Sequence, residues 1–469
     1  MKKRVVVIGA GMGGLTASIA LSQRGFDVCV LEARSESGGL ASACVFDGLR
    51  FDAGPYILLD RPGLEWAFAS LGEDLNAHLE LRRIDDIYDV ASPGQPPVHF
   101  RASLEETAAG FERQWPGSGK KYERFIQRTA RTYRALEPML HASNPRIEIL
   151  KRPGAWPHVP FLSKPLGAVL AESGLPEPIA NAISIWTHVA GQSPQKAPSP
   201  LAFVPALIHT VGAFYPRNGI GEIPRVLVAL AQRRGVEFRY QTRVRTLLCK
   251  NGKVCGVELA TGQTLSADAV VSNYSGIGTH LEMLAETPAP VREKLAALPL
   301  QSPGVCAYLA TADRASGPYL RFFLPGGDVL CRLLIRPEVV APECRIGAEA
   351  PVRLLAPMRY DDAEAGGESG QARFLADVFA ETWWRDSVGA SRVLATRIPA
   401  EWGAQFNLYR QSMNPVMTAA FMRAGRLPHR SPHVRGLYLS GSSTHPGQWV
   451  SFCAISGILA AQRLQLDIE

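Results

Sequence analysis

A run of small residues near the N-terminus has the composition and spacing of a phosphate-binding turn. Gly9, Gly11 and Gly14 follow the pattern G-x-G-x-x-G, and Gly13 adds a fourth glycine. Glycines at these positions let the backbone approach a pyrophosphate closely. Glu32 lies 18 residues beyond Gly14, where a carboxylate can accept hydrogen bonds from both hydroxyls of an adenosine ribose. This combination predicts a site for an adenine dinucleotide.

The residues that follow Glu32 indicate which dinucleotide to expect. A Gly38-Gly39 pair and then Gly54-Pro55 come next, and a flavin-bearing dinucleotide needs such a second backbone surface along its pyrophosphate and ribityl chain. FAD is therefore favoured over NAD. Arg34 could pair with the 2′-phosphate of NADP, but the nearby Glu32 carboxylate would repel that phosphate, so a solvated side chain is the preferred interpretation of Arg34.

A second stretch with chemical potential, GSSTHPGQWVSFCAISG, lies at 441–457. The apolar run from Phe452 to Leu464 predicts a helix, which places the Thr-His-Pro-Gly turn at the N-terminal end of that helix. Free backbone N–H groups and the positive end of the helix dipole favour an anionic ligand there. His445 is interpreted as holding the turn through a side-chain hydrogen bond rather than as a group that transfers protons.

Strand and helix patterns surround these two stretches. Val5–Ile8 and Phe26–Leu31 are short apolar runs typical of strands, and the residues after Gly14 carry apolar side chains at helical spacing. Further along, Ile223–Arg234 predicts a helix, and an apolar strand ends at Asn273. Strand, glycine turn, helix and second strand form the context in which the glycine pattern predicts a dinucleotide site.

Two glycine-containing stretches are interpreted as breaks between elements. Asn251-Gly252 stands between alternating apolar residues and predicts a hairpin. Gly366 to Gly370 is rich in polar and small residues and predicts a polar loop.

The overall composition limits the classes of function. The chain has 469 residues, 46% of them hydrophobic, and a formal net charge of +7 without a long Lys/Arg block. This charge permits contact with acidic lipid but requires no nucleic acid, and no nucleic-acid partner is expected. No run approaches the roughly 18 apolar residues of a membrane helix. Eight cysteines without a Cys-x-x-Cys pair or zinc spacing indicate reduced thiols of a cytoplasmic protein, with no metal site.

Four stretches, in order, carry a resemblance to a known family. They are VVVIGAGMGGLTASIALSQRGFDVCVLEA at the start, FDAGPYIL at 51–58, YPRNGIGEIP with the later RVRTLL and ADAVVSN, and LYLSGSSTHPG at 437–447. Together they resemble the phytoene (carotenoid) desaturase and carotenoid isomerase family, within the FAD-dependent amine oxidase-like superfamily. The resemblance covers nearly the whole chain, and FDAGP and THPG point to this branch of the superfamily.

The resemblance implies a mixed α/β (α+β) fold with a discontinuous, Rossmann-like FAD-binding domain and an inserted substrate-binding domain. The FAD-binding domain is expected to comprise residues 1–75, 212–282 and 425–469. The substrate-binding domain is expected to comprise residues 76–211 and 283–424.

The resemblance also implies roles for particular residues. By position, Val244 would hold the adenine through backbone bonds, and Gly441 and Ser442 would meet the ribityl and pyrophosphate portion. The N–H groups at 448–450 would meet the flavin O2, where a reduced flavin gathers negative charge. The expected cofactor-binding residues are Gly9, Ala10, Gly11, Met12, Gly13, Gly14, Glu32, Ala33, Arg34, Gly38, Gly39, Leu40, Ala41, Gly54, Pro55, Tyr56, Val244, Asn273, Gly441, Ser442, Gln448, Trp449 and Val450.

The sequence departs from the family pattern near the flavin. Leu40 stands where the family often has Arg or Lys, Tyr56 where it usually has Thr or Ser, and Gln448-Trp449 replaces glycine-like residues. At Leu40 a charge on the pyrophosphate is missing, and backbone N–H groups are expected to replace it. The changes at Tyr56 and at Gln448-Trp449 put the substrate in doubt more than the cofactor. The candidate pocket residues are Tyr56, Tyr215, His445 and Trp449, and no acid is identified as a catalytic base.

Residues 120–140 predict a cationic amphipathic helix. One face carries Tyr122, Phe125, Ile126, Tyr133, Leu136 and Leu140, and the other carries Lys120, Lys121, Arg124, Arg128, Arg131 and Arg134. A helix packed on the substrate-binding domain with a solvated basic face is favoured. The alternative is a helix that lies on anionic lipid, at the inner face of the membrane, and a lipid-soluble substrate would strengthen this alternative.

The preferred hypothesis is an FAD-dependent oxidoreductase that desaturates a hydrophobic small molecule, an isoprenoid or polyene. Hydride would pass from an allylic carbon to flavin N5, while conjugation spreads the developing cation. Two alternatives stay open. One is a flavin-dependent cis–trans isomerase or double-bond reductase on the same scaffold. The other is an oxidase or dehydrogenase of a smaller amine or secondary-metabolite precursor, which the aromatic Tyr56 and Trp449 favour.

Overall fold

A five-stranded parallel sheet carries the N-terminal glycine turn. The computed structural model describes residues 2–468. In it the strands of this sheet have the order β19-β13-β1-β2-β9, and every pairing is parallel. Their bounds are β1 (Arg4–Ile8), β2 (Asp27–Leu31), β9 (Glu237–Arg239), β13 (Ala269–Ser272) and β19 (Leu437–Leu439). The two N-terminal strands expected from the sequence are confirmed, and three distant parts of the chain build one sheet.

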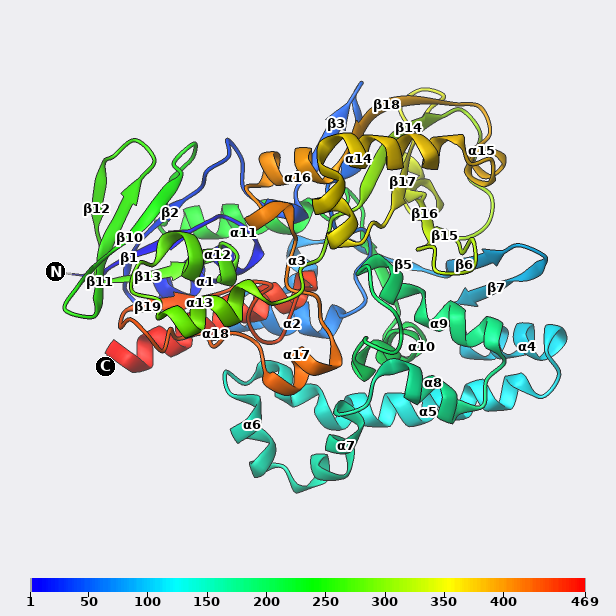
Figure 1. Cartoon of the computed structure of the whole chain (residues 1–469), viewed down its shortest axis with the longest axis horizontal. Coiled ribbons are helices and arrows are strands. Elements are labelled where there is room, and N and C mark those ends of the chain that lie inside the picture. The colour runs from blue at the N-terminus through cyan, green and yellow to red at the C-terminus, as the bar shows by residue number, and fades with distance from the viewer. Residues whose placement is uncertain (1, 469) are drawn as a thin grey trace.

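Three helices cover this sheet, and two of them meet at the glycine turn. They are α1 (Met12–Gln23), α11 (Glu222–Arg233) and α18 (Val450–Ile468). Figure 1 shows α1 and α18 close together in the left half of the molecule, although they come from opposite ends of the chain. The Thr16 hydroxyl of α1 donates to the carbonyl of Ala454 in α18, at 2.8 Å. The C-terminal helix begins two residues before the expected Phe452.

A separate small antiparallel sheet packs against the first one. It contains β10 (Val244–Lys250), β11 (Lys253–Leu259) and β12 (Thr264–Ser266). Asn251 and Gly252 connect β10 to β11 with backbone φ angles of 52° and 69°. The left-handed backbone suits Asn and Gly, and the hairpin expected there is confirmed.

A seven-stranded mixed sheet forms the second half of the molecule, at the upper right of Figure 1. Its order is β18-β14-β17-β16-β15-β6-β7, with β15 and β6 parallel and the other pairs antiparallel. The bounds are β6 (Asp86–Ser92), β7 (Gln95–Arg101), β14 (Val305–Thr311), β15 (Leu320–Phe323), β16 (Arg332–Ile335), β17 (Ala350–Ala356) and β18 (Ser391–Arg397). Strand β17 is buried along its whole length, so this sheet has covered faces.

Helix α14 (Tyr360–Ala380) packs on this sheet and contains the stretch expected to be a loop. The prediction of a polar loop at Gly366–Gly370 was wrong. The helix is interrupted there only at Gly367, whose φ of 55° is non-helical. Ala363 is buried before the break and Gln371 and Val378 are buried after it, so both parts of the helix pack against the rest of the protein.

A layer of helices lies below the seven-stranded sheet in Figure 1. It comprises α4 (Leu104–Gln114), α5 (Ser118–Leu136), α6 (Pro145–Glu148), α7 (Val159–Leu162), α8 (Leu166–Ser173), α9 (Glu177–Val189) and α10 (Phe203–Thr210). In α5 the aromatic side chains of Tyr122 and Phe125 are buried, and the six Lys and Arg residues of the expected basic face are exposed. No helix within residues 2–468 is both long and apolar enough to cross a bilayer.

The two sheets give the molecule a mixed α/β architecture, as expected. All five strands of the parallel sheet fall within the ranges 1–75, 212–282 and 425–469. The exact boundaries of an FAD-binding and a substrate-binding domain stay a prediction.

Candidate cofactor and substrate site

A single cavity of about 870 Å³ brings together the stretches that the sequence singled out. Its wall includes the glycine turn after β1, the end of β2, residues 54–60, Gly441 and Ser442, and residues from 448 to 453 at the start of α18. The carboxyl ends of parallel strands meet at one edge of a sheet, and this edge is where open α/β sheets bind their ligands. The fold therefore places both predicted groups of residues around one space.

Glu32 stands at the end of β2 with its carboxylate held by backbone groups. One oxygen accepts a hydrogen bond from the Ala10 N–H at 2.7 Å, and the other accepts from the Arg34 N–H at 2.9 Å. The side chain is 7% exposed and lines the cavity. Each carboxylate oxygen keeps a second acceptor site, so the geometry leaves room for two hydroxyl donors of a ribose.

The glycine turn is packed so tightly that side chains would not fit. A Cβ on Gly13 would lie 2.6 Å from the Asn273 side chain and 2.8 Å from the Gly441 nitrogen. A Cβ on Gly14 would lie 2.0 Å from the Gly9 carbonyl oxygen. Asn273, directly after β13, therefore occupies the space between the turn and residue 441. This contact joins the N-terminal glycines to the C-terminal turn and forms a backbone cradle of the kind a pyrophosphate needs.

The C-terminal turn is fixed to α18 by hydroxyl groups. The Ser456 hydroxyl accepts from the Gly441 N–H at 2.9 Å and lies 2.6 Å from the Thr444 hydroxyl. Gln448, Trp449 and Val450 follow and line the cavity at the N-terminal end of α18. The Gln448 side-chain oxygen is buried without a partner. A helix N-terminus at this point presents its positive end to the cavity.

Most of the predicted residues line this one cavity, and four do not. Those in its wall are Gly9, Gly11, Met12, Gly13, Glu32, Ala33, Arg34, Gly38, Gly39, Leu40, Ala41, Gly54, Pro55, Tyr56, Val244, Asn273, Gly441, Ser442, Gln448, Trp449 and Val450. Ala10 and Gly14 lie behind the turn, where Ala10 binds Glu32 and Gly14 packs on Gly9. Tyr215 and His445 are also outside the cavity wall.

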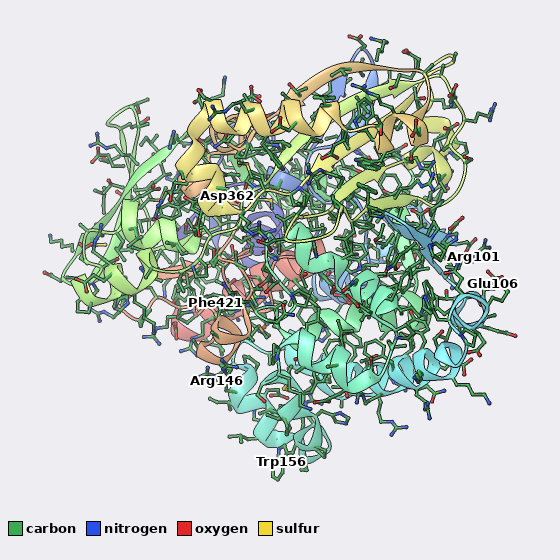
Figure 2. All side chains as sticks on the ribbon, turned by 45° about the vertical axis from the view of Figure 1, so that its right-hand side comes forward. Arg101, Glu106, Arg146, Trp156, Asp362 and Phe421 are labelled. Carbon is green, nitrogen blue, oxygen red and sulfur yellow. The ribbon has the colours of Figure 1, made fainter. Side chains whose placement is uncertain are left out.

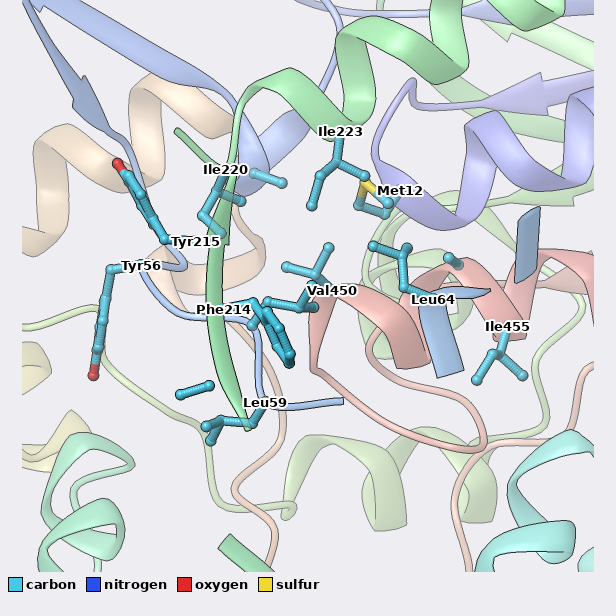
Figure 3. Close-up of a cluster of buried hydrophobic side chains, with 14 of the residues drawn as sticks. Met12, Tyr56, Leu59, Leu64, Phe214, Tyr215, Ile220, Ile223, Val450 and Ile455 are labelled. Atoms are coloured by element: carbon cyan, nitrogen blue, oxygen red, sulfur yellow. The ribbon is translucent and has the colours of Figure 1, made fainter. Parts of the chain in front are cut away.

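Tyr215 belongs to a buried polar pair beside the cavity. Its hydroxyl donates to Asp52 Oδ2 at 2.8 Å, and the Ile220 N–H donates to Asp52 Oδ1 at 2.7 Å. Burial raises the pKa values of both Asp52 and Tyr215. Figure 3 shows Tyr215 and Tyr56 on neighbouring segments within the buried apolar cluster. Tyr215 thus anchors the strand β8 (Ala213–Pro216) to the FDAGP turn.

His445 points away from the cavity wall and toward the 3-10 helix η2 (Glu137–His141). Its Nε2 lies 2.8 Å from the carbonyl oxygen of Met139, so the neutral ring donates there. Burial lowers its pKa to about 3. Three further histidines, His209, His280 and His429, have pKa values lowered by burial to about 4. We call these four residues the buried histidines.

Two buried charged residues of the cavity wall were not found from the sequence. Arg353 on β17 is 4% exposed. Its guanidinium donates to the Gly54 carbonyl at 2.8 Å and also to the Asp52 carbonyl. The guanidinium carbon lies 5.4 Å from the centre of the Tyr56 ring. Asp60 is 1% exposed and accepts from the Ser451 hydroxyl at 2.9 Å. Burial raises the pKa of the Asp60 carboxyl. Neither residue sits in a motif that sequence patterns could have revealed.

The remaining wall of the cavity is largely apolar. It is formed by Trp186, Val189, Leu201, Val204, Leu355, Trp402, Phe406, Met413 and Met417. These residues come from α9, the 3-10 helix η5 (Ser199–Ala202), α10, β17, α16 (Pro399–Phe406) and the loop before α17 (Ala419–Ala424), all outside the parallel sheet. The cavity therefore joins a backbone cradle for a dinucleotide to an apolar compartment.

Comparison with known proteins identifies the family. The sequence profile of the flavin-containing amine oxidoreductases matches residues 12–316. The chain belongs to this family. It is an oxidoreductase, and its cofactor is FAD. The contacts of Glu32, the close packing at Gly13 and the unpartnered Gln448 oxygen fit a bound dinucleotide.

Curated relatives of this flavoenzyme include carotenoid desaturases. A zeta-carotene-forming phytoene desaturase of Myxococcus xanthus is 27% identical, with 98% of this chain and 94% of the relative covered. A 4,4'-diapolycopene oxygenase of Methylomonas sp. is 24% identical, with coverage of 100% and 99%. The expected resemblance to carotenoid desaturases is confirmed.

Solved structures share the fold of this flavoenzyme at low identity. An oxidoreductase from Methanosarcina mazei matches with a TM-score of 0.69 at 16% identity, covering 98% of this chain and all of that one. Putrescine oxidase bound to putrescine matches with a TM-score of 0.64 at 15% identity, covering 100% and 99%. These likenesses confirm the amine oxidase-like fold.

Proposed function

We propose that this flavoenzyme desaturates a long hydrophobic molecule, an isoprenoid or polyene. The observation that carries the proposal is the continuity of the cavity, whose wall passes from the cradle around Glu32 to an apolar compartment around Leu201 and Met417. The names of the curated relatives support the same substrate class. When bound, FAD supplies the hydride acceptor at N5.

The residues of the chain would bind and orient such a substrate rather than activate it. Trp186, Leu201 and Val204 offer apolar surface that excludes water and favours a hydrocarbon chain. A desaturation also releases a proton. We propose Asp60 as the acceptor of that proton, because burial raises its pKa and the residue lies in the cavity wall beside Ser451.

Anaerobic mixing of the FAD-loaded protein with phytoene in liposomes tests the proposal. Bleaching of the oxidised flavin together with a longer-wavelength polyene chromophore is the expected result. Asp60→Asn should slow this reaction at least tenfold, because Asn can keep the bond to Ser451 but cannot take a proton at neutral pH. A flavin that stays oxidised, with an altered polyene only after prior reduction, would instead favour the isomerase or reductase. Bleaching by soluble amines alone would favour the amine oxidase.

We further propose that the flavoenzyme binds anionic lipid on the cytoplasmic side of a membrane. Four of the nine most exposed large apolar side chains within residues 2–468 cluster in one short segment: Ile147, Leu150, Trp156 and Val159, which are 40–67% exposed. In Figure 2 Trp156 lies at the lower tip of the molecule, near Arg146. Exposed apolar groups gathered in this way are typical of an interaction surface.

Charge complements this apolar tip. The six exposed Lys and Arg residues of α5 form no salt bridge with any carboxylate of the described chain, and α5 packs against the 3-10 helix η4 (Pro153–His158) that carries Trp156. Beneath the tip, an apolar cluster connects Ile149 and Phe161 with Trp449 of the cavity wall. Such a path would let an apolar substrate pass between a bilayer and the cavity.

Vesicle flotation tests this contact. The flavoenzyme should float with phosphatidylcholine vesicles that contain phosphatidylglycerol and less with pure phosphatidylcholine, because each cation near an anionic surface contributes about 1 kcal/mol. The double variant Arg128→Glu/Arg131→Glu should abolish the preference for anionic vesicles, and Trp156→Ser should weaken binding to both. As a matched control, Arg101→Glu changes an exposed charge outside α5. Equal flotation of all variants would contradict the proposal.

A further inference from the structure

The apolar compartment of the cavity contains a group of side-chain amides with unusual hydrogen bonding. Within residues 2–468, four Asn or Gln side-chain oxygens are buried without a hydrogen-bond partner, and all four belong to residues of the cavity wall. One is Gln448, at the cofactor end. The other three are Gln192, Gln301 and Asn414, which we call the amide cluster. Buried polar atoms in native proteins are rarely left without a partner, so this concentration in one wall requires an explanation.

Hydrogen bonds hold the amide cluster together as one unit. The Gln301 backbone N–H donates to the Asn414 carbonyl at 2.9 Å, and the Met413 N–H donates back to the Gln301 carbonyl at 2.9 Å. The side chain of Gln192 reaches the same stretch, because its Nε2 donates to the Met417 carbonyl at 3.0 Å. The three residues thus come from one small region, where the end of α9 meets the segments before β14 and α17.

Two of the amides have a fixed orientation. Nε2 of Gln301 donates to the Val189 carbonyl at 3.3 Å, as Nε2 of Gln192 does to Met417. Exchanging nitrogen and oxygen in either amide would set one oxygen against another, so these bonds determine which end is the acceptor. The side chains of Gln192 and Gln301 are only 8% and 5% exposed. Each therefore has a desolvated oxygen within the cavity wall that can only accept a hydrogen bond.

We propose that the amide cluster is a subsite for a hydroxyl group at one end of the substrate. This inference rests on the proposed function and narrows its substrate class to hydroxylated polyenes or isoprenoid alcohols. A neutral hydroxyl donor matches amide oxygens. A cationic amine would need a carboxylate, and the cluster contains none. The bonds to Met417 and Val189 fix which end of each glutamine amide is the oxygen, and a small turn about the soft terminal torsion still lets that oxygen meet the donor. A purely hydrocarbon substrate leaves the oxygens unpaired, at a cost in affinity.

Matched polyenes test this subsite. The probes are neurosporene and hydroxyneurosporene, which differ by a terminal hydroxyl, and the measurement is anaerobic bleaching of the FAD-loaded protein at increasing polyene concentration. The wild-type protein should half-saturate with hydroxyneurosporene at about tenfold lower concentration than with neurosporene. Gln301→Met and Gln192→Met keep the side-chain length and should reduce this ratio to less than threefold, because each removes an acceptor for the hydroxyl and also the cost that an unpaired oxygen imposes on the hydrocarbon.

A control variant separates the subsite from general damage to the fold. Gln371 is also buried, but its amide is fully bonded to Ala363, Ala400 and Gln411, and it is not part of the cavity wall. Gln371→Met should therefore keep the tenfold ratio. An equal response of the wild type to both polyenes, or an unchanged ratio in Gln301→Met, would overturn the subsite.

Failure of the subsite can be distinguished from failure of the proposed function. If neither polyene bleaches the flavin, the desaturation proposal fails. The subsite is then tested by the binding of farnesol and farnesene, an alcohol and a hydrocarbon. Binding is followed by the fluorescence of the cavity tryptophans Trp186, Trp402 and Trp449. Tighter binding of the alcohol, lost in Gln301→Met, supports the subsite. Equal binding of the two compounds overturns it.

Discussion

The contact between α1 and α18 predicts that a single methyl group will disturb both stability and cofactor binding. A Cβ on Gly457 would lie 2.0 Å from the Gly13 carbonyl oxygen, 2.2 Å from the Thr16 hydroxyl and 2.9 Å from the Ala17 nitrogen. Ordinary contact begins near 3.4 Å. Gly457→Ala must therefore separate the two helices by about 1.4 Å at this point, since two of the three neighbouring atoms are backbone.

The expected cost has two parts. Overpacking a tight contact costs about 1–3 kcal/mol, and separation also weakens the Thr16–Ala454 hydrogen bond, at about 1 kcal/mol. Urea denaturation of the FAD-free protein should show a loss of about 3 kcal/mol. FAD titration should show at least tenfold weaker binding, because Gly13 lines the cavity. Gly370→Ala in α14, with no atom within 4 Å, is the matched control and should be neutral or stabilising. A loss below 1 kcal/mol with unchanged FAD affinity would refute the reasoning.

Three further predictions follow from the site. Glu32→Ala should weaken FAD binding at least tenfold in a fluorescence titration, because it removes the ribose acceptors and leaves the Ala10 and Arg34 N–H groups unpaired; a change below twofold would contradict this. Arg353→Met removes a positive charge from the cavity wall and should lower the midpoint potential of bound FAD by about 30 mV, equivalent to about 1.4 kcal/mol for two electrons. Arg353→Lys keeps the charge and should shift the potential less. An unchanged potential in Arg353→Met would argue against a role for this charge. The buried histidines have lowered pKa values in the folded protein, so below pH 6.5 the unfolded chain binds more protons than the folded one. The free energy of unfolding should therefore fall as the pH drops from 6.5 toward 4. The loss should be about 1 kcal/mol per histidine at pH 5.5, and His429→Gln should flatten the measured dependence; a stability that is constant over this range would show the reasoning to be wrong.

Most residues that local patterns assigned to the cofactor cradle line one cavity, because the determinants of the cradle are close in sequence. The glycine turn, Glu32 and the Thr-His-Pro-Gly turn each combine a backbone requirement with an adjacent strand or helix. The tight contact of Asn273 with Gly13 shows that the glycines serve packing as well as access. Nothing in the pattern revealed that second role, since it depends on how three distant segments meet.

Side-chain direction and isolated charges could not be predicted. Tyr215 was expected in the pocket, but pairing of β8 with β5 (Leu81–Ile84) turns its hydroxyl toward Asp52. Arg353 is one arginine among many in the sequence, and only the register of β17 brings it to the Gly54 carbonyl. The glycines of α14 illustrate a related limit, because helix propensity is a weak prior that tertiary packing overrides.

The pairing of α1 with α18 also governs when the flavoenzyme can mature. The contact from Thr16 to Ala454 spans 438 positions, so the first helix waits for its partner while almost the whole chain is synthesised. At about 5–20 residues per second this wait lasts roughly 20–90 s. During that time the apolar surface of α1 lacks its cover and the cradle lacks one wall. The complete cradle for FAD therefore forms only after α18 has been synthesised.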